Sequence, residues 1–316
     1  MSGLANIALP AKVKPPRFAV IGLGALGRLY AASLRLSGFE VYGLSRHGKP
    51  CCYQFQPTQS QPNQQHKIEL VPPPLNHPLD YLLLTTKAQQ ALSAVQQWRP
   101  QFGPQTTLIL LHNGQGTLAP LTALLGTGQR ILQATSSHGA LRTGEQLIHS
   151  GQGQTIIGPG SGPELTDDQR QQLLDALNSA LPPAIWQQQI QQALWLKLAI
   201  NAVINPLTAI HQCRNGALQQ AHFQPQIEQL LDELALLYQQ LDVPLQREQL
   251  HPALNRVIHD TAENYSSMNR DLAAGRDTEI EAISGFLLHQ ARQQGLTLAG
   301  HQQLYQQICA KQQQPN

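Results

Sequence analysis

A strongly apolar stretch, residues 195–209, carries three polar side chains that could take part in chemistry. Lys197, Asn201 and Asn205 follow one another at intervals of four residues, so they share one face if the stretch is helical. Burying an ammonium and two amides there is costly unless they have partners. A polar stripe that faces a ligand explains the pattern better than a lysine that reaches solvent. Pro206 predicts a helix end or kink at Asn205.

A second polar group lies closer to the C-terminus. Thr278 is a candidate cap for a helix, and Glu279 and Glu281 follow it directly. Acidic side chains in a first helical turn complement the helix dipole, so these two need not belong to a site. The residues alone leave both interpretations open.

A glycine loop near the start of the chain has the spacing of a dinucleotide-binding turn. Gly22, Gly24 and Gly27 lie between a predicted strand, residues 17–21, and a predicted helix, residues 28–37. In such loops the first glycine permits the turn, the second admits the diphosphate, and the third allows close helix–strand packing. The alternative is a glycine-rich turn without a ligand, but the strand–loop–helix setting favours the nucleotide.

The end of the next predicted strand, residues 39–44, indicates which dinucleotide binds. NAD enzymes place an acidic residue there to hold the ribose 2′-OH. This chain has Arg46, with Glu40 only at the start of the strand. Arg46 could pair with a 2′-phosphate, so we expect NADP(H). The alternative is an ordinary solvated arginine.

The remaining pattern predicts an α/β fold, a Rossmann-type doubly wound N-terminal domain followed by an all-α C-terminal domain. We expect residues 1–16 to be a flexible extension, residues 17–188 the NADP-binding domain and residues 189–316 the helical substrate domain. Further expected strands are residues 53–56, 67–71, 80–85, 107–112, 130–135, 145–150, 154–157 and 184–188. Further expected helices are residues 89–98, 167–177, 193–204, 225–241, 252–262 and 280–294.

Bulk composition excludes several classes of protein. The chain has 316 residues, 41% of them hydrophobic, and a net charge of +2, which fits a globular enzyme and not a nucleic-acid binder. Its four cysteines form no CxxC pair, so we expect no metal site. The apolar runs are interrupted before the length of a membrane span, and no signal peptide is evident. We therefore expect a cytoplasmic protein without a membrane partner.

Taken together, these motifs resemble those of the ketopantoate reductase (2-dehydropantoate 2-reductase) family. The motifs are GLGALG, HNGQG, LWLKLAINAVINPLTA, AENYSSM and DTEIEAISGF, in that order along nearly the whole folded chain. The resemblance implies NADPH-dependent reduction of 2-dehydropantoate to (R)-pantoate, on the route to pantothenate and coenzyme A.

The resemblance also implies roles for individual residues. Lys197 would be the catalytic proton donor, and Glu279 a second catalytic residue that contacts the cofactor and tunes the site. The implied cofactor contacts are Gly22, Leu23, Gly24, Ala25, Leu26, Gly27, Arg46, Lys87, Asn113, Ala140 and Glu279. The implied substrate contacts are Asn113, Lys197, Asn201, Asn205, Asn215 and Ser267.

The hypothesis also predicts the electrostatics and the motion of the site, and two alternative functions remain open. An ammonium in an apolar cleft should have a lowered pKa, and a nearby carboxylate should oppose that fall. The cleft between the domains should close on its ligands. One rival is an NADP-dependent dehydrogenase of another 2- or 3-hydroxy acid, and the other is a non-catalytic NADPH sensor that binds a protein. The partner we expect is a small 2-oxo acid, and the protein is expected to be a monomer or homodimer.

Overall fold

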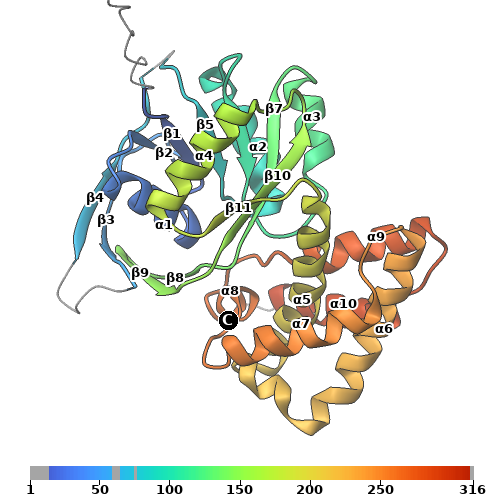
Figure 1. The fold of residues 1–316 in the computed structure, drawn as a ribbon. Helices are drawn as coiled ribbons and strands as arrows, with labels where there is room; N and C mark the ends of the chain where they lie inside the picture. The colour runs from blue at the N-terminus through green and yellow to red at the C-terminus, as the bar shows by residue number, and fades with distance from the viewer. Residues whose placement is uncertain (1–13, 59–64, 75–76, 314–316) are drawn as a thin grey trace, which may run out of the picture.

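The computed structural model describes residues 14–58, 65–74 and 77–313. Residues 1–13, most of the predicted N-terminal extension, lie outside the described part of the chain. The first half forms a layered α/β unit and the second half a set of packed helices, with α5 (Ile190–His211) leading from one to the other (Figure 1). This arrangement confirms the predicted fold class. The domain boundary near residue 188 stays a prediction.

A seven-stranded mixed sheet forms the centre of the α/β unit. Its strands, from edge to edge, are β11 (Ala184–Trp186), β10 (Thr155–Ser161), β7 (Arg130–Ser136), β6 (Thr107–Leu110), β5 (Tyr81–Leu84), β1 (Phe18–Ile21) and β2 (Val41–Leu44). The five strands from β7 to β2 are parallel, whereas β10 is antiparallel to β7. The carboxyl ends of the five parallel strands therefore meet at one edge, where open α/β sheets bind ligands.

Helices cover both faces of this sheet, as the continuous apolar strands predict. Successive residues of β1 face opposite cores: Phe18 packs with α1 (Ala25–Leu36) and α4 (Asp167–Ala180), and Ala19 with α2 (Ala88–Trp98) and α3 (Leu118–Leu125). A short 3₁₀ turn, η1 (Arg99–Gln101), follows α2. The two faces explain why β5 is buried along its whole length.

A second sheet of four strands lies on the other side of α1. Its order is β4 (His66–Leu70), β3 (Cys51–Gln56), β9 (Gln146–Gly151) and β8 (Gly139–Thr143), and α1 packs against β8 and β9 as well as the main sheet. The sequence pattern predicts residues 145–150 within one doubly wound sheet and does not predict β8, whereas the structure places both strands in this second sheet. Burial alternates along β3, with Tyr53 and Phe55 inward and Gln54 outward. This two-residue period is typical of a sheet covered on one face.

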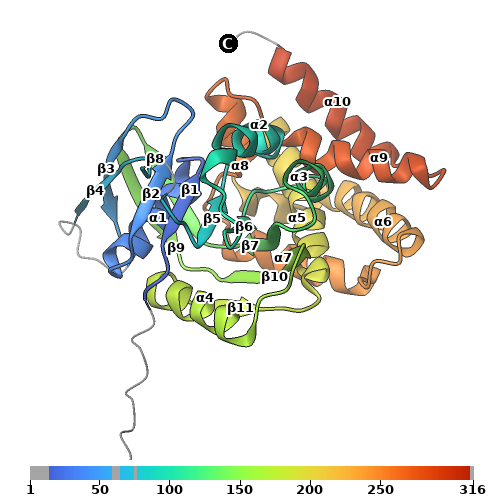
Figure 2. The same cartoon turned by 90° about the horizontal axis from the view of Figure 1, so that it is seen from above.

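The helical half has its own apolar core around α5. Its other elements are η2 (Asn215–Gln219), η3 (Ala221–Phe223), α6 (Gln224–Gln240), α7 (Arg247–Asp260), α8 (Ser267–Ala273), the π-helical turn η4 (Glu281–Gly285), α9 (Phe286–Gln293) and α10 (Ala299–Gln313). Fully buried Leu207, Leu234 and Leu287 join α5, α6 and α9 in one cluster. The helix α10 packs against α5 and α6, where Leu304 and Ile308 join the same core, and Figure 2 shows it beside α9.

The central helix α5 differs from expectation in two respects. It does not end at Asn205 but continues through Pro206 to His211. Proline removes one backbone hydrogen bond, and the nearly complete burial of the flanking apolar residues offsets that loss. The helix is also long and apolar enough to cross a membrane by length and composition, although 61% of the relevant window is buried inside the protein, as in a core helix.

The glycine loop between β1 and α1 shows which of its glycines the fold itself requires. A Cβ on Gly27 would lie 2.0 Å from the Gly22 carbonyl oxygen, and one on Gly22 would lie 2.6 Å from the Thr86 nitrogen. Gly24 has no neighbour within 4 Å of such a Cβ. Packing therefore accounts for Gly22 and Gly27 but leaves Gly24 without a structural reason.

We predict that Gly27→Ala lowers the free energy of unfolding by about 1–3 kcal/mol, because the methyl group overpacks the turn. Gly24→Ala is the matched control, with the same methyl group in open space. Urea denaturation followed by circular dichroism measures both. Equal stability of the two variants would contradict this assignment of the glycines.

Candidate active site

Loops from the five parallel strands gather at the carboxyl edge of the main sheet. The loop after β1 carries Gly22, the one after β2 carries Arg46, and the one after β5 carries Lys87; Asn113 follows β6, and Ser136 ends β7. A cleft of about 1570 Å³ lies along this edge, lined by the first three of these loops, β8 and residues 264–276. The two halves of the chain therefore meet at the place where the strands end.

The first part of the glycine loop faces this cleft. Gly22, Leu23, Gly24 and Ala25 line it, so the open space over Gly24 is part of the cleft. Leu26 and Gly27, also predicted as cofactor contacts, do not line it, because they pack toward the protein. The N-terminus of α1 begins at Ala25, where unpaired backbone N–H groups favour an anion.

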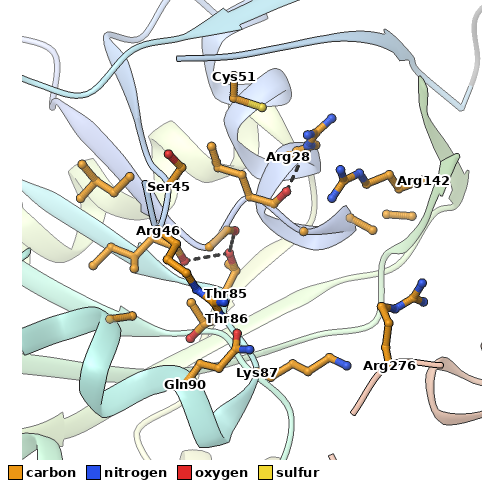
Figure 3. A pocket seen from close by; sticks show the side chains of 18 of the residues that line it. Arg28, Ser45, Arg46, Cys51, Thr85, Thr86, Lys87, Gln90, Arg142 and Arg276 are labelled. Carbon is orange, nitrogen blue, oxygen red and sulfur yellow. Dashed lines mark hydrogen bonds between the residues drawn. The ribbon is translucent and has the colours of Figure 1, made fainter. Parts of the chain in front are cut away.

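Arg46 lines the cleft at its β2 end. The side chain is exposed and has no carboxylate partner among the described residues, and the Gln97 amide holds its backbone carbonyl at 2.9 Å. Ser45 and Lys49 close the same turn through two hydrogen bonds with the Ser45 hydroxyl. Figure 3 shows Ser45 and Arg46 on the same side of the cleft, across from Arg142. A fixed backbone with a free guanidinium suits recognition of an anionic group.

Lys197 reaches the carboxyl end of β7 from α5. Its ammonium donates to the Ser136 backbone carbonyl at 2.8 Å. Burial lowers the pKa of Lys197 to about 8, and the negative charge of Glu279 opposes that fall. Both effects were expected from the sequence. The result is an ammonium that can exchange its proton near neutral pH.

Asn113 and Glu279 meet beside this lysine. Asn113 Nδ2 donates to Glu279 Oε2 at 3.1 Å. Burial raises the pKa of Glu279, while the bonds from Asn113 and from the Ala88 N–H at the start of α2 lower it. The carboxylate therefore connects the loops after β5 and β6 with the helical half.

Backbone contacts hold the same two segments together. The Ala282 carbonyl in the π turn η4 accepts the Gln115 N–H at 3.1 Å. Gly114 has a φ of +83°, and a Cβ there would lie 2.6 Å from that carbonyl oxygen. The HNGQG loop therefore requires glycine at this position to reach the segment that carries Glu279.

The other predicted substrate contacts occupy different surroundings. Asn201 is half-buried and Asn205 is buried, and neither side chain has a hydrogen-bond partner in the part of the chain that the structure describes. Ser267 is exposed and lines the cleft. Asn215 lies in η2, where Nδ2 donates to Thr261 Oγ1 at 2.9 Å, and Oδ1 is buried without a partner.

Lys87 and Ala140 both line the cleft. The Lys87 ammonium pairs with Asp271 at 2.8 Å and also donates to the Asp277 carbonyl. Lys87 therefore ties the loop after β5 to the helical half in this structure. Ala140 belongs to β8, so the second sheet contributes to the cleft wall.

Sequence reasoning missed three residues that shape this site. His112 lies beside Lys197 at the end of β6, and burial lowers its pKa to about 4, so it is neutral at pH 7. Asp271 receives both Lys87 and Arg276. Gln312, near the end of α10, accepts the Thr278 N–H at 2.6 Å. Only His112 had a signal, its place directly before Asn113.

Comparisons with known proteins agree along most of the chain. The profile of the ketopantoate reductase family (PanE/ApbA) matches residues 18–162, and that of its C-terminal part matches residues 189–312. A 2-dehydropantoate 2-reductase from Vibrio cholerae is 39% identical over 92% of this chain and 95% of its own length. The chain belongs to the ketopantoate reductase family. It is therefore an oxidoreductase, as the resemblance implied.

Solved structures share the fold at lower identity. D-mandelate dehydrogenase with NADH and anilino(oxo)acetate superposes with a TM-score of 0.84 at 18% identity, covering 94% of this chain and 98% of that one. A ketopantoate reductase from Staphylococcus aureus, described as dimeric, gives a TM-score of 0.80 at 22% identity, covering 94% and 99%. These likenesses concern the fold alone.

We predict that Gln312→Ala loosens the segment that carries Glu279. Thr278 is 4% exposed, so its freed N–H lacks water as a replacement partner. Hydrogen exchange of the Thr278 amide should accelerate at least tenfold in the variant. Gln313→Ala, at the exposed neighbouring position, is the control and should leave the exchange rate unchanged. Gln312→Glu should keep the Thr278 amide protected, because glutamate retains the acceptor oxygen. Unchanged exchange in Gln312→Ala would contradict the support assigned to α10.

Proposed function

We propose that this protein reduces 2-dehydropantoate to (R)-pantoate with NADPH, as a cytoplasmic enzyme of pantothenate and coenzyme A biosynthesis. The observation that carries the proposal is the Lys197 ammonium. It lies at the carboxyl edge of the sheet with Glu279 beside it, in a chain of the ketopantoate reductase family. The substrate is a small 2-oxo acid, and we expect a monomer or homodimer.

The cleft fits an NADP dinucleotide. The open space over Gly24 gives room for a diphosphate, and the N–H groups at the N-terminus of α1 can donate to it. The free guanidinium of Arg46 supplies a cation for a 2′-phosphate. Bound NADPH would supply the hydride for the substrate carbonyl carbon. Asn113 and Glu279, which lie at the same edge of the sheet, would contact the nicotinamide end of NADPH. Lys87 and Ala140 would contact the cofactor as well.

Lys197 would act on the substrate carbonyl oxygen. Negative charge develops there during reduction, and a preorganised ammonium stabilises it and then gives up a proton from Nζ. The Ser136 carbonyl holds Nζ in place before substrate binds. The pKa of about 8 keeps most of the lysine protonated at pH 7 while making proton loss easier than from a free lysine.

The amides of Asn201 and Asn205 would bind the substrate on the same face of α5. Their side chains have no hydrogen-bond partners among the described residues, and neither residue lines the cleft in this structure. The two amides would pair with a ligand's hydroxyl and carboxylate groups once the ligand enters beside α5. Ser267, exposed in the cleft wall, would bind from α8. Asn215 would contribute its unpartnered Oδ1 from η2, after a shift that brings η2 to the ligand.

We predict that Lys197→Ala reduces turnover roughly 100- to 10 000-fold, because both charge stabilisation and proton donation are lost. Binding of NADPH, measured by fluorescence titration, should remain near that of the wild type. Wild-type turnover should fall as the pH rises through about 8, where the ammonium deprotonates. The control is Lys67→Ala, on the exposed face of β4. Near wild-type turnover of Lys197→Ala would remove this lysine from the mechanism.

We predict that Arg46→Ala weakens NADPH binding tenfold or more and leaves NADH binding unchanged. A guanidinium–phosphate pair is a charge-assisted bond, whereas NADH offers only a hydroxyl at that position. Dissociation constants for the two nucleotides measure the effect. Equal losses for both would mean that Arg46 does not recognise the 2′-phosphate.

A neighbouring activity, reduction of a different 2-oxo acid, shares every feature of the nucleotide cleft. A panel of 2-oxo acids assayed by NADPH absorbance separates it from ketopantoate reduction. The proposal requires ketopantoate to give the highest kcat/KM in that panel. A preference for another acid would keep the fold and cofactor but change the substrate.

A further inference from the structure

Two arginines from different layers of the fold meet at the cleft. Arg28 lies in the first turn of α1, and Arg142 extends from β8 in the second sheet. Both line the cleft, and Figure 3 shows their guanidinium groups directed toward one another. Residues more than 100 positions apart thus place two positive charges side by side.

Arg28 is built into the protein with part of its guanidinium unused. Its Nε donates to the Leu23 carbonyl in the glycine loop at 3.1 Å, and its guanidinium carbon lies 4.8 Å from the centre of the Tyr53 ring. The residue is only 7% exposed, and the terminal nitrogen Nη1 is buried without a hydrogen-bond partner. A buried charged donor without a partner is costly, so this guanidinium keeps hydrogen-bonding capacity for an anion bound in the cleft that Arg28 lines.

Arg142 likewise lacks a counterion. Its Nε donates to the Gly144 carbonyl at 3.1 Å, and no carboxylate pairs with Arg28 or Arg142 among the described residues. Arg276 approaches the pair but is bound to Asp271 at 2.9 Å. Seven lysines and arginines but two acids line this cleft, in a chain whose net charge is only +2. The local excess of positive charge favours an anion.

We propose that Arg28 and Arg142 form a clamp for the diphosphate of the dinucleotide. The assignment rests on the proposed function, since it takes the cleft as a nucleotide site. Arg28 is bound to the glycine loop itself, at the N-terminus of α1, where the backbone N–H groups await the diphosphate. Arg46, on the other side of the cleft, is the cation for the 2′-phosphate. The clamp makes the second sheet a functional part of the cofactor site.

Two nucleotide fragments test the clamp independently of catalysis. Adenosine 2′-monophosphate has the 2′-phosphate but no diphosphate, and ADP-ribose has the diphosphate but no 2′-phosphate. Calorimetry gives the dissociation constant of each fragment with the wild type and with Arg142→Gln. We expect Arg142→Gln to weaken the binding of ADP-ribose about tenfold or more, as for the loss of a hydrogen bond to a charged group. The same variant should leave the binding of adenosine 2′-monophosphate unchanged.

Matched variants make the result decisive. Arg46→Ala should weaken the binding of adenosine 2′-monophosphate and leave that of ADP-ribose unchanged. Arg256 is exposed on α7, so Arg256→Gln should leave the binding of both fragments unchanged. Arg28→Gln should follow Arg142→Gln, with circular dichroism checking its fold because Arg28 is buried. Unchanged ADP-ribose binding by Arg142→Gln would overturn the clamp. Failure of the wild type to bind either fragment or NADPH would instead overturn the proposed function.

Discussion

The bond between the Lys197 ammonium and the Ser136 carbonyl connects the two halves of this protein at its candidate active site. The ammonium comes from the central helix of the helical half, and the carbonyl ends a strand of the main sheet. Neither half alone encloses the charge. The lowered pKa of Lys197 is therefore a property of the assembled fold, because burial causes it and Glu279 of the helical half limits it.

The site has two electrostatic regions with different requirements. Around Lys197 the groups are few and partly buried: a carboxylate, a neutral His112 and amides, which suits the movement of a single proton. Along the cleft, guanidinium groups keep their charge at every relevant pH, which suits steady retention of an anion. Lys87, bound to Asp271, lies where the two regions meet. In the proposed function these regions correspond to substrate chemistry and cofactor retention.

Much of this arrangement could be predicted because it depends on local pattern. The four-residue spacing of Lys197 and Asn201 indicated a shared helical face, and the continuous apolar residues of β5 indicated a sheet covered on both sides. Other features depend on partners distant in sequence. Gln312 acts only through Thr278, and Arg142 gains its meaning only beside Arg28, so neither has a signature in its own neighbourhood. The passage of α5 through Pro206 likewise depends on burial by surrounding helices.

The π turn between Glu279 and α9 constrains the number of residues in that segment more than the identity of their side chains. A π turn holds one residue more than an α-helical turn, and the Ala282 carbonyl within this turn accepts the Gln115 N–H. Deleting one residue within 281–285 would remove the extra residue and let the segment return to regular α-helical spacing without turning α9. Such a deletion would instead move the Ala282 carbonyl relative to the Gln115 N–H, so its effect would be felt in the loop that carries Asn113.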